Sequence, residues 1–215
     1  MNMVPTIKDI EAFARRSFSD IHGSHDWSHT QRVYKLCMRI GQKEGADLDV
    51  LSIAAYLHDV GRAIQDRSNG TVCHAQKGAE IATGLLRNYP LSEDQKANII
   101  HCIQSHRFRG VDKPESLEAK VLFDADKLDS IGAIGIGRAF QFAGEIGAKL
   151  HNPLIDPSDS LPYTEEDTGY REFRQKLIKI KDKMMTDEGV RIAKERHEFM
   201  VAFFQRFLLE YDCIQ

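Results

Sequence analysis

Apolar residues recur at intervals of three and four positions along most of the chain, and no long stretch alternates apolar and polar residues. This spacing fits the 3.6-residue turn of an α-helix and not the two-residue repeat of a half-buried strand. One such stripe, from Val33 to Ile40, predicts a helix from about residue 26 to residue 44 that Gly45 can end. The pattern therefore predicts an all-α fold.

Local signals define further predicted elements. Capping boxes, in which a Ser or Thr is followed three positions later by an acidic or amide residue, predict helix starts at Thr6 and Ser92. An amphipathic pattern over about residues 170–211 predicts core helices, and its apolar face could also bury a homodimer contact. Residues 151–169 hold three of the six prolines and several acidic residues, which predicts a polar surface loop or lid.

The composition is that of an ordinary globular protein. The 215 residues are 28% charged and 42% hydrophobic, with a formal net charge of −3, so no basic excess favours a nucleic acid polymer as partner. No segment approaches the roughly 18 apolar residues of a membrane span, and the first 16 residues lack the pattern of a secretory signal. The four cysteines show no C-x-x-C spacing. We expect a cytoplasmic protein with reduced cysteines and no membrane contact.

Histidine and aspartate gather in three separate blocks, which are His25 with His29, the pair His58-Asp59, and the aspartates Asp124, Asp126 and Asp129. Imidazole nitrogens and carboxylate oxygens are ligands that first-row divalent ions accept. The pair His58-Asp59 closes an apolar stretch, where burial of an uncompensated charge costs several kcal/mol. A metal ion would compensate it. Either histidine of the first block can face an ion, and the three aspartates cannot all bind one.

Together the blocks resemble the HD superfamily of metal-dependent phosphohydrolases. The matching segments are His25-Asp26-x-x-His29-x-x-Arg32-Val33, His58-Asp59-Val60-Gly61-Arg62 and Asp124-Ala125-Asp126-x-Leu128-Asp129-x-x-Gly132. A small bacterial and archaeal branch of pyrophosphohydrolase-like proteins also shares the segments that begin at His74 and Thr186. The resemblance implies a single HD domain over residues 1–215, a helical bundle with its core at about 20–135 and a carboxy-terminal helical extension.

The resemblance also selects among the candidate ligands. It implies one divalent ion (Mn, Ni, Co, Fe, Zn or Mg) bound by His29, His58, Asp59 and Asp126, of which His58, Asp59 and Asp126 form the catalytic centre. Asp124 would orient a histidine ligand or a water from behind. His25 would hold substrate, or it is a hydrogen-bonded structural histidine. Asp129 is either a further candidate of this block or a structural residue, in a helix cap or a salt bridge.

Further side chains are candidates for binding phosphate. Arg62 offers a permanently charged, forked set of donors, and Lys127 is a second candidate whose alternative is a solvated charge. His74, His101 and His106 fall in the interval where some HD relatives bind a second ion. They can equally hydrogen-bond a phosphate or give a proton to a leaving group.

The implied activity is hydrolysis of a phosphoester or phosphoanhydride bond in a small, nucleotide-like substrate. Such a site would lower the pKa of a water and polarise a phosphoryl oxygen, with no need for a nucleophilic side chain. A di-iron oxygenase of the same fold and a non-catalytic nucleotide sensor are the alternatives. The sensor is disfavoured because all four implied ligands are present.

Overall fold

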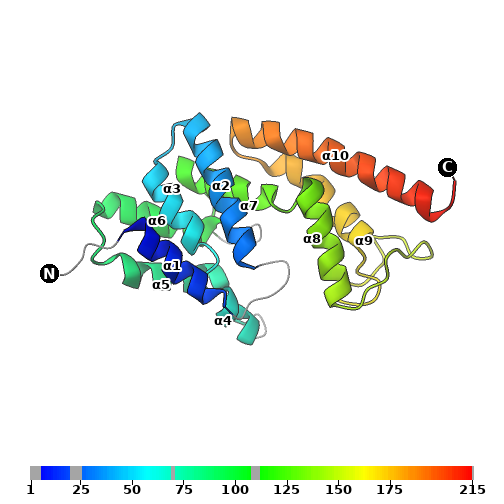
Figure 1. Ribbon diagram of the computed structural model, residues 1–215, viewed down its shortest axis with the longest axis horizontal. Coiled ribbons are helices and arrows are strands. Elements are labelled where there is room, and N and C mark those ends of the chain that lie inside the picture. The colour runs from blue at the N-terminus through cyan, green and yellow to red at the C-terminus, as the bar shows by residue number, and fades with distance from the viewer. Residues whose placement is uncertain (1–5, 20–25, 69–70, 108–111, 215) are drawn as a thin grey trace. The chain divides into compact units, whose positions relative to one another are not determined.

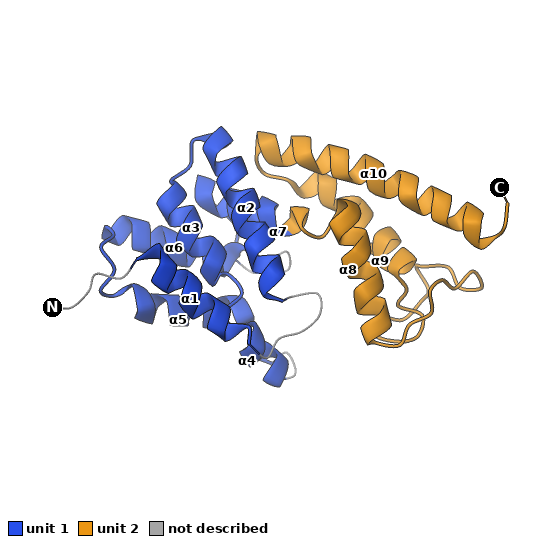
Figure 2. Cartoon of the chain, in the orientation of Figure 1, with its two compact units in different colours: residues 1–126 blue, residues 127–215 orange. Residues whose placement is uncertain are grey.

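A computed structural model describes residues 6–19, 26–68, 71–107 and 112–214. In these ranges all regular secondary structure is helical (Figure 1), so the predicted all-α class is confirmed. The chain forms two compact units, residues 1–126 and residues 127–215 (Figure 2). That the whole chain is a single HD domain stays a prediction, which the division into two units does not test.

The first unit surrounds one apolar helix. Its elements are α1 (Ile7–Ser17), α2 (Trp27–Glu44), α3 (Leu48–Leu57), α4 (Arg62–Arg67), α5 (His74–Leu86), α6 (Glu93–Ser105) and most of α7 (Leu117–Leu128). Helix α3 packs against α1, α2 and α6, and every residue from Ile53 to Leu57 is buried. A helix that is apolar on all sides belongs in a core. Because α3 ends at the buried Leu57, the next two residues, His58 and Asp59, also lie in the interior.

Polar side chains fix where the helices start. Asp26 caps α2 by accepting a hydrogen bond from the backbone N–H of His29 at 3.1 Å, and Gly45 ends this helix with a φ of 77°. Ser92 forms the predicted capping box of α6, and the backbone N–H of Thr6 donates to Asp9 Oδ2 at 2.7 Å before α1. The structure confirms the predicted starts of these helices. The sequence could predict them because they depend on local spacing alone.

The second unit packs around aromatic rings. Its complete elements are α8 (Gly132–Glu145), α9 (Gly169–Gln175), the 3₁₀-helix η1 (Leu177–Lys183) and α10 (Asp187–Tyr211). Phe173 of α9 stacks on Phe204 of α10 with ring centroids 4.3 Å apart, and Phe140 of α8 lies 6.1 Å from Phe204. Residues 151–168 form turns without a helix. The rings therefore join three helices of this unit.

Arg171 of α9 holds the turn segment against the helix that follows it. Its Nε donates to Ser160 Oγ at 2.7 Å, and its Nη1 pairs with Asp167 Oδ1 at 2.8 Å. A forked guanidinium can satisfy several acceptors at once, which suits it to fixing a loop. In the described part of the chain, no helix is both long and apolar enough to cross a membrane.

Phe204→Ala should destabilise the protein by about 3–5 kcal/mol, because Phe204 is only 1% exposed and its removal leaves a cavity between packed rings. The measurement is the free energy of urea unfolding followed by circular dichroism. Phe199→Ala on the same helix is the matched control: this ring is 52% exposed, and its loss should cost about 0.5 kcal/mol or less. Equal losses in the two variants would contradict the aromatic core.

Candidate metal centre

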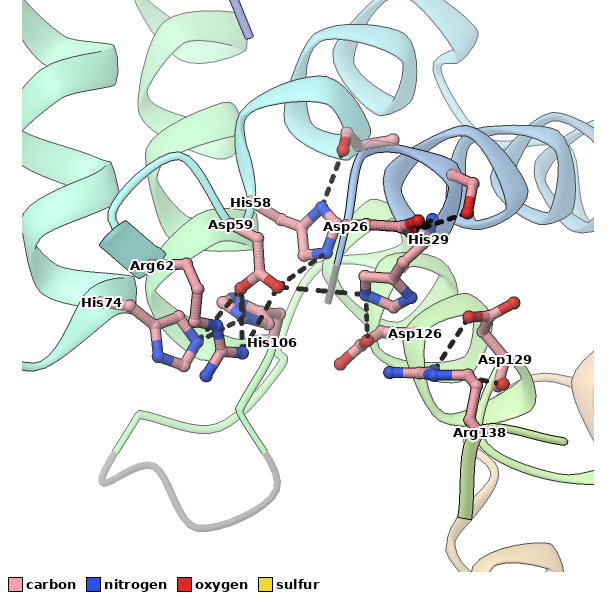
Figure 3. A network of polar contacts seen from close by, with 12 residues as sticks. Asp26, His29, His58, Asp59, Arg62, His74, His106, Asp126, Asp129 and Arg138 are labelled. Atoms are coloured by element: carbon pink, nitrogen blue, oxygen red, sulfur yellow. Dashed lines mark hydrogen bonds and ion pairs between the residues drawn. The ribbon is translucent and has the colours of Figure 1, made fainter. Parts of the chain in front are cut away.

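Five segments of the first unit bring histidine and aspartate side chains together (Figure 3). His29 lies on α2, His58 and Asp59 directly follow α3, His74 begins α5, His106 follows α6, and Asp126 lies in the last turn of α7. Asp59 and His58 are 2% and 0% exposed, because the apolar helix before them ends in the core. The structure thus collects residues that lie almost a hundred positions apart in the sequence.

His29, His58 and Asp126 form the first group of candidate ligands. One ligand atom of each lies within 4.8 Å of the other two, and His29 Nε2 is 3.4 Å from Asp126 Oδ1. Asp59 Oδ2 approaches both histidines, at 3.9 Å from His29 Nε2 and 3.8 Å from His58 Nε2. Atoms bound at about 2.1 Å to one ion are roughly 3–4 Å apart. His29, His58 and Asp126 therefore have the spacing of a shared cation site, and Asp59 lies next to the two histidines of this group.

Asp59, His74 and His106 form a second group around the other oxygen of Asp59. Asp59 Oδ1 lies 3.3 Å from His74 Nε2 and 3.6 Å from His106 Nε2, and these two nitrogens are 3.2 Å apart. The same ligand atoms satisfy the spacing of a metal group. Asp59 consequently stands between two sets of donors, with one oxygen toward each.

Backbone and amide carbonyls fix the proton positions of three of these histidines. The Nδ1 atoms of His58 and His106 lie 2.7 Å from the carbonyl oxygens of Ala55 and Ile103, and that of His74 lies 2.8 Å from Gln65 Oε1. A carbonyl oxygen can only accept, so each neutral ring carries its hydrogen on Nδ1 and directs a lone pair from Nε2. The lone pairs face Asp59, as metal ligands require.

Burial keeps two of the rings in the neutral form that binds metal. Burial lowers the pKa of His58 to about 4 and that of His74 to about 2, although Asp59 acts in the opposite direction on both. Within the described residues, the buried Nε2 of His58 has no hydrogen-bond partner. A buried polar atom without a partner costs about 1–3 kcal/mol. A cation would satisfy this lone pair, so the donor set fits a divalent ion.

Arg62 lies against Asp59. Its Nη2 is 3.3 Å from both carboxylate oxygens, and this contact is partly buried. Burial by itself raises the pKa of Asp59, but Arg62 and the neighbouring histidines outweigh it and hold that pKa well below its usual value. Asp59 is therefore an ionised carboxylate across the neutral pH range.

The remaining candidates lie elsewhere or outside the described residues. His101 Nε2 accepts a hydrogen bond from the backbone N–H of Glu115 at 3.0 Å and joins neither group. Asp124 is buried in α7, and Lys127 is half-buried in the same helix. His25 lies outside the described residues. Asp129 pairs with Arg138 at 2.9 Å, which favours the salt bridge over a helix cap.

Gln65 is a neighbour of the site that the sequence does not single out. It lies on α4 and meets His74 across the segment that joins α4 to α5. Glutamine is common on helix surfaces, and no motif in the chain marks this one. Its contact follows from how two helices pack, which local spacing does not encode.

The chain belongs to the HD superfamily. The sequence profile of the HD domain matches residues 26–131, the range that contains both groups of candidate ligands. HD domains bind divalent metal ions, and the two groups described above can hold such an ion.

Individual relatives extend the likeness over nearly the whole chain. The uncharacterized protein YpgQ of Bacillus subtilis (strain 168) is 35% identical over 216 residues, which cover 99% of this chain and 96% of YpgQ. A crystal structure of B. subtilis YpgQ in complex with ADP has a TM-score of 0.73, with 32% identity over 96% of this chain and 97% of that one. An HD-superfamily hydrolase from Bacillus thuringiensis has a TM-score of 0.76 at 29% identity, covering 97% of each chain.

A more distant likeness is confined to part of the chain. Ribonuclease Y of Chloroflexus aurantiacus is 29% identical over 119 residues, which are 55% of this chain and 21% of ribonuclease Y. The match therefore concerns a shared segment and not the whole of that enzyme.

His29→Ala should weaken Mn²⁺ binding by at least about 100-fold, because the loss of an outer hydrogen-bond partner alone costs about 10–100-fold. Isothermal titration calorimetry on the full chain measures the affinity. His101→Ala is the matched control, since the His101 ring bonds Glu115 instead of the candidate ligands, and its Mn²⁺ affinity should stay within about threefold of wild type. A similar loss in both variants would rule out His29 as a specific ligand.

Proposed function

We propose that this chain is a metal-dependent phosphohydrolase that cleaves a phosphoester or phosphoanhydride bond in a small nucleotide-like substrate. The observation that carries the proposal is the buried Nε2 of His58, which has no hydrogen-bond partner among the described residues and lies 3.8 Å from the ionised Asp59. Such an arrangement suits a cation. The likeness to an HD-superfamily hydrolase supports the reaction class, and the ADP in the YpgQ crystal structure supports a nucleotide.

In this proposal His29, His58, Asp59 and Asp126 hold one divalent ion. Two imidazoles and two carboxylates suit Mn, Ni, Co, Fe, Zn or Mg, with positions left for water and substrate oxygens. When bound, such an ion supplies Lewis acidity, which lowers the pKa of a water toward neutrality and offsets charge on a phosphoryl oxygen. The hydrogen bond from His58 Nδ1 to the carbonyl oxygen of Ala55 keeps that ring turned inward.

Charge balance favours an anionic substrate. Asp59 and Asp126 as ionised side chains, with Arg62 beside Asp59, carry one negative charge in excess. One divalent ion reverses the sign and leaves one positive charge in excess. A buried site with excess positive charge attracts phosphate groups. Arg62, which already lies next to Asp59, is placed to meet such a group, and Lys127 and His25 remain candidates for further contacts.

A second cation at Asp59, His74 and His106 is supported by one specific observation. The Nε2 atoms of His74 and His106 lie 3.2 Å apart, and both rings carry their hydrogens on Nδ1. When both rings are neutral, their facing lone pairs repel one another beside the carboxylate, and a cation bound by both nitrogens would relieve this repulsion. In this form of the proposal, Asp59 would belong to the donor sets of both cations.

The same donor set would also suit a di-iron oxygenase, which is the second candidate function. Metal analysis of the purified protein separates the two activities. Two irons per chain together with oxygen uptake would favour the oxygenase, whereas phosphate release with added Mn²⁺, Co²⁺ or Ni²⁺ would favour the phosphohydrolase.

Asp59→Asn should abolish nucleotide hydrolysis, with kcat lowered by at least about 100-fold, because removing one charge-stabilising group from a catalytic centre costs this much. The assay follows phosphate or pyrophosphate release over a panel of nucleotides and sugar phosphates, each with several divalent ions. Asp159→Asn in the exposed turn segment is the matched control and should keep wild-type activity. Full activity in Asp59→Asn would refute the proposed reaction centre.

A further inference from the structure

We propose that Gln65 is a positioning residue that sets the affinity of the second cation site at Asp59, His74 and His106. The inference rests on the two-cation form of the proposed function and adds to it a residue outside the donor set. Gln65 lies on α4, is half-buried, and accepts hydrogen bonds from the backbone and the ring of His74.

The contact between Gln65 and His74 has one consistent hydrogen-bond pattern. Gln65 Oε1 lies 3.3 Å from the backbone nitrogen of His74 and 2.8 Å from its Nδ1. A backbone N–H can only donate, so the amide atom that faces it is the oxygen. An oxygen can only accept, so Nδ1 of His74 carries the hydrogen. Gln65 thereby fixes both the tautomer of His74 and the direction of its Nε2 lone pair.

The other rings with known Nδ1 partners are held differently. His58 and His106 donate to the carbonyls of Ala55 and Ile103, each three residues earlier in the same stretch of helix. Such a bond follows from helical geometry and needs no side chain from another element. Of these three histidines, His74 is the one whose orientation depends on a side chain from a different helix. A substitution at Gln65 can therefore change the orientation of His74 in the second group, whereas the orientation of His58 depends on no such side chain.

A close backbone contact brings α4 to the start of α5. A Cβ placed on Gly61 would lie 2.3 Å from the carbonyl oxygen of His74 and 2.9 Å from the nitrogen of Gly78. Only glycine permits this approach. The contact places the first turn of α4 against the first turn of α5, and Gln65 lies one turn beyond Gly61, within reach of the His74 ring.

The neutral amide of Gln65 also sets how basic the His74 ring is as a metal ligand. An imidazole whose Nδ1–H faces a carboxylate is a more basic ligand than one whose Nδ1–H faces an uncharged carbonyl. Gln65→Glu should therefore keep the orientation of His74 and strengthen the second cation site. Gln65→Leu removes the acceptor with little change in side-chain size and should weaken that site.

The test titrates the full chain with Mn²⁺ and counts bound ions by calorimetry and by the loss of the free Mn²⁺ signal in electron paramagnetic resonance. The wild-type protein should bind two Mn²⁺ ions in two resolved binding events, and the second event should report the site at Asp59, His74 and His106. Gln65→Leu should weaken the second event by about 10–100-fold and leave the first unchanged, and Gln65→Glu should bind the second ion at least as tightly as wild type. Gln76→Leu, at an exposed position of α5, is the matched control and should resemble wild type.

Three results would overturn the inference. They are an unchanged second event in Gln65→Leu, an equal weakening of both events, and a wild-type protein that binds one ion at saturating Mn²⁺. Failure of the proposed function is distinguishable from these results. If no nucleotide or sugar phosphate is hydrolysed while the selective loss in Gln65→Leu is observed, the reaction is wrong and the role of Gln65 stands.

Discussion

The burial of Asp59 is the constraint on which the site depends. Removing a carboxylate from water costs several kcal/mol, and this one is 2% exposed at the end of an apolar helix. The charge is retained because the Arg62 guanidinium lies 3.3 Å from the carboxylate, stabilises the ionised form and lowers its pKa. The side chains around this buried anion have the spacing that a bound cation would need.

The core and the site share one element. Helix α3 is buried along its last five residues, and its end delivers His58 and Asp59 into the interior. A polar pair placed at the exposed end of a surface helix would be solvated and would need no partners. Here the apolar character of α3 creates a demand for charge compensation, which Arg62 meets. The hydrophobic core thus determines where the chemistry lies.

Local spacing in the sequence predicts the helices well and the site in part. The α2 helix and its end at Gly45 follow from neighbouring residues, and the structure has them as predicted. The sequence groups His101 with His106, but the two rings point to different partners, Glu115 and Asp59. They lie five positions apart near the end of one helix, which is a rotation of about 140°, so the two side chains leave that helix on different faces. Gln65 has no signal at all because its contact is tertiary.

The two groups of donors differ in what holds them. The ring of His58 is oriented by a carbonyl of its own helix, so its geometry forms as soon as α3 forms. The ring of His74 is oriented from α4, which has six residues and is too short to be a stable helix by itself. Helix α4 is placed by its packing against α5, through the glycine contact at the carbonyl of His74. The orientation of His58 is thus set by its own helix and that of His74 by the packing of two helices, which makes His74 the part of the candidate centre that sequence change outside the candidate ligands can adjust.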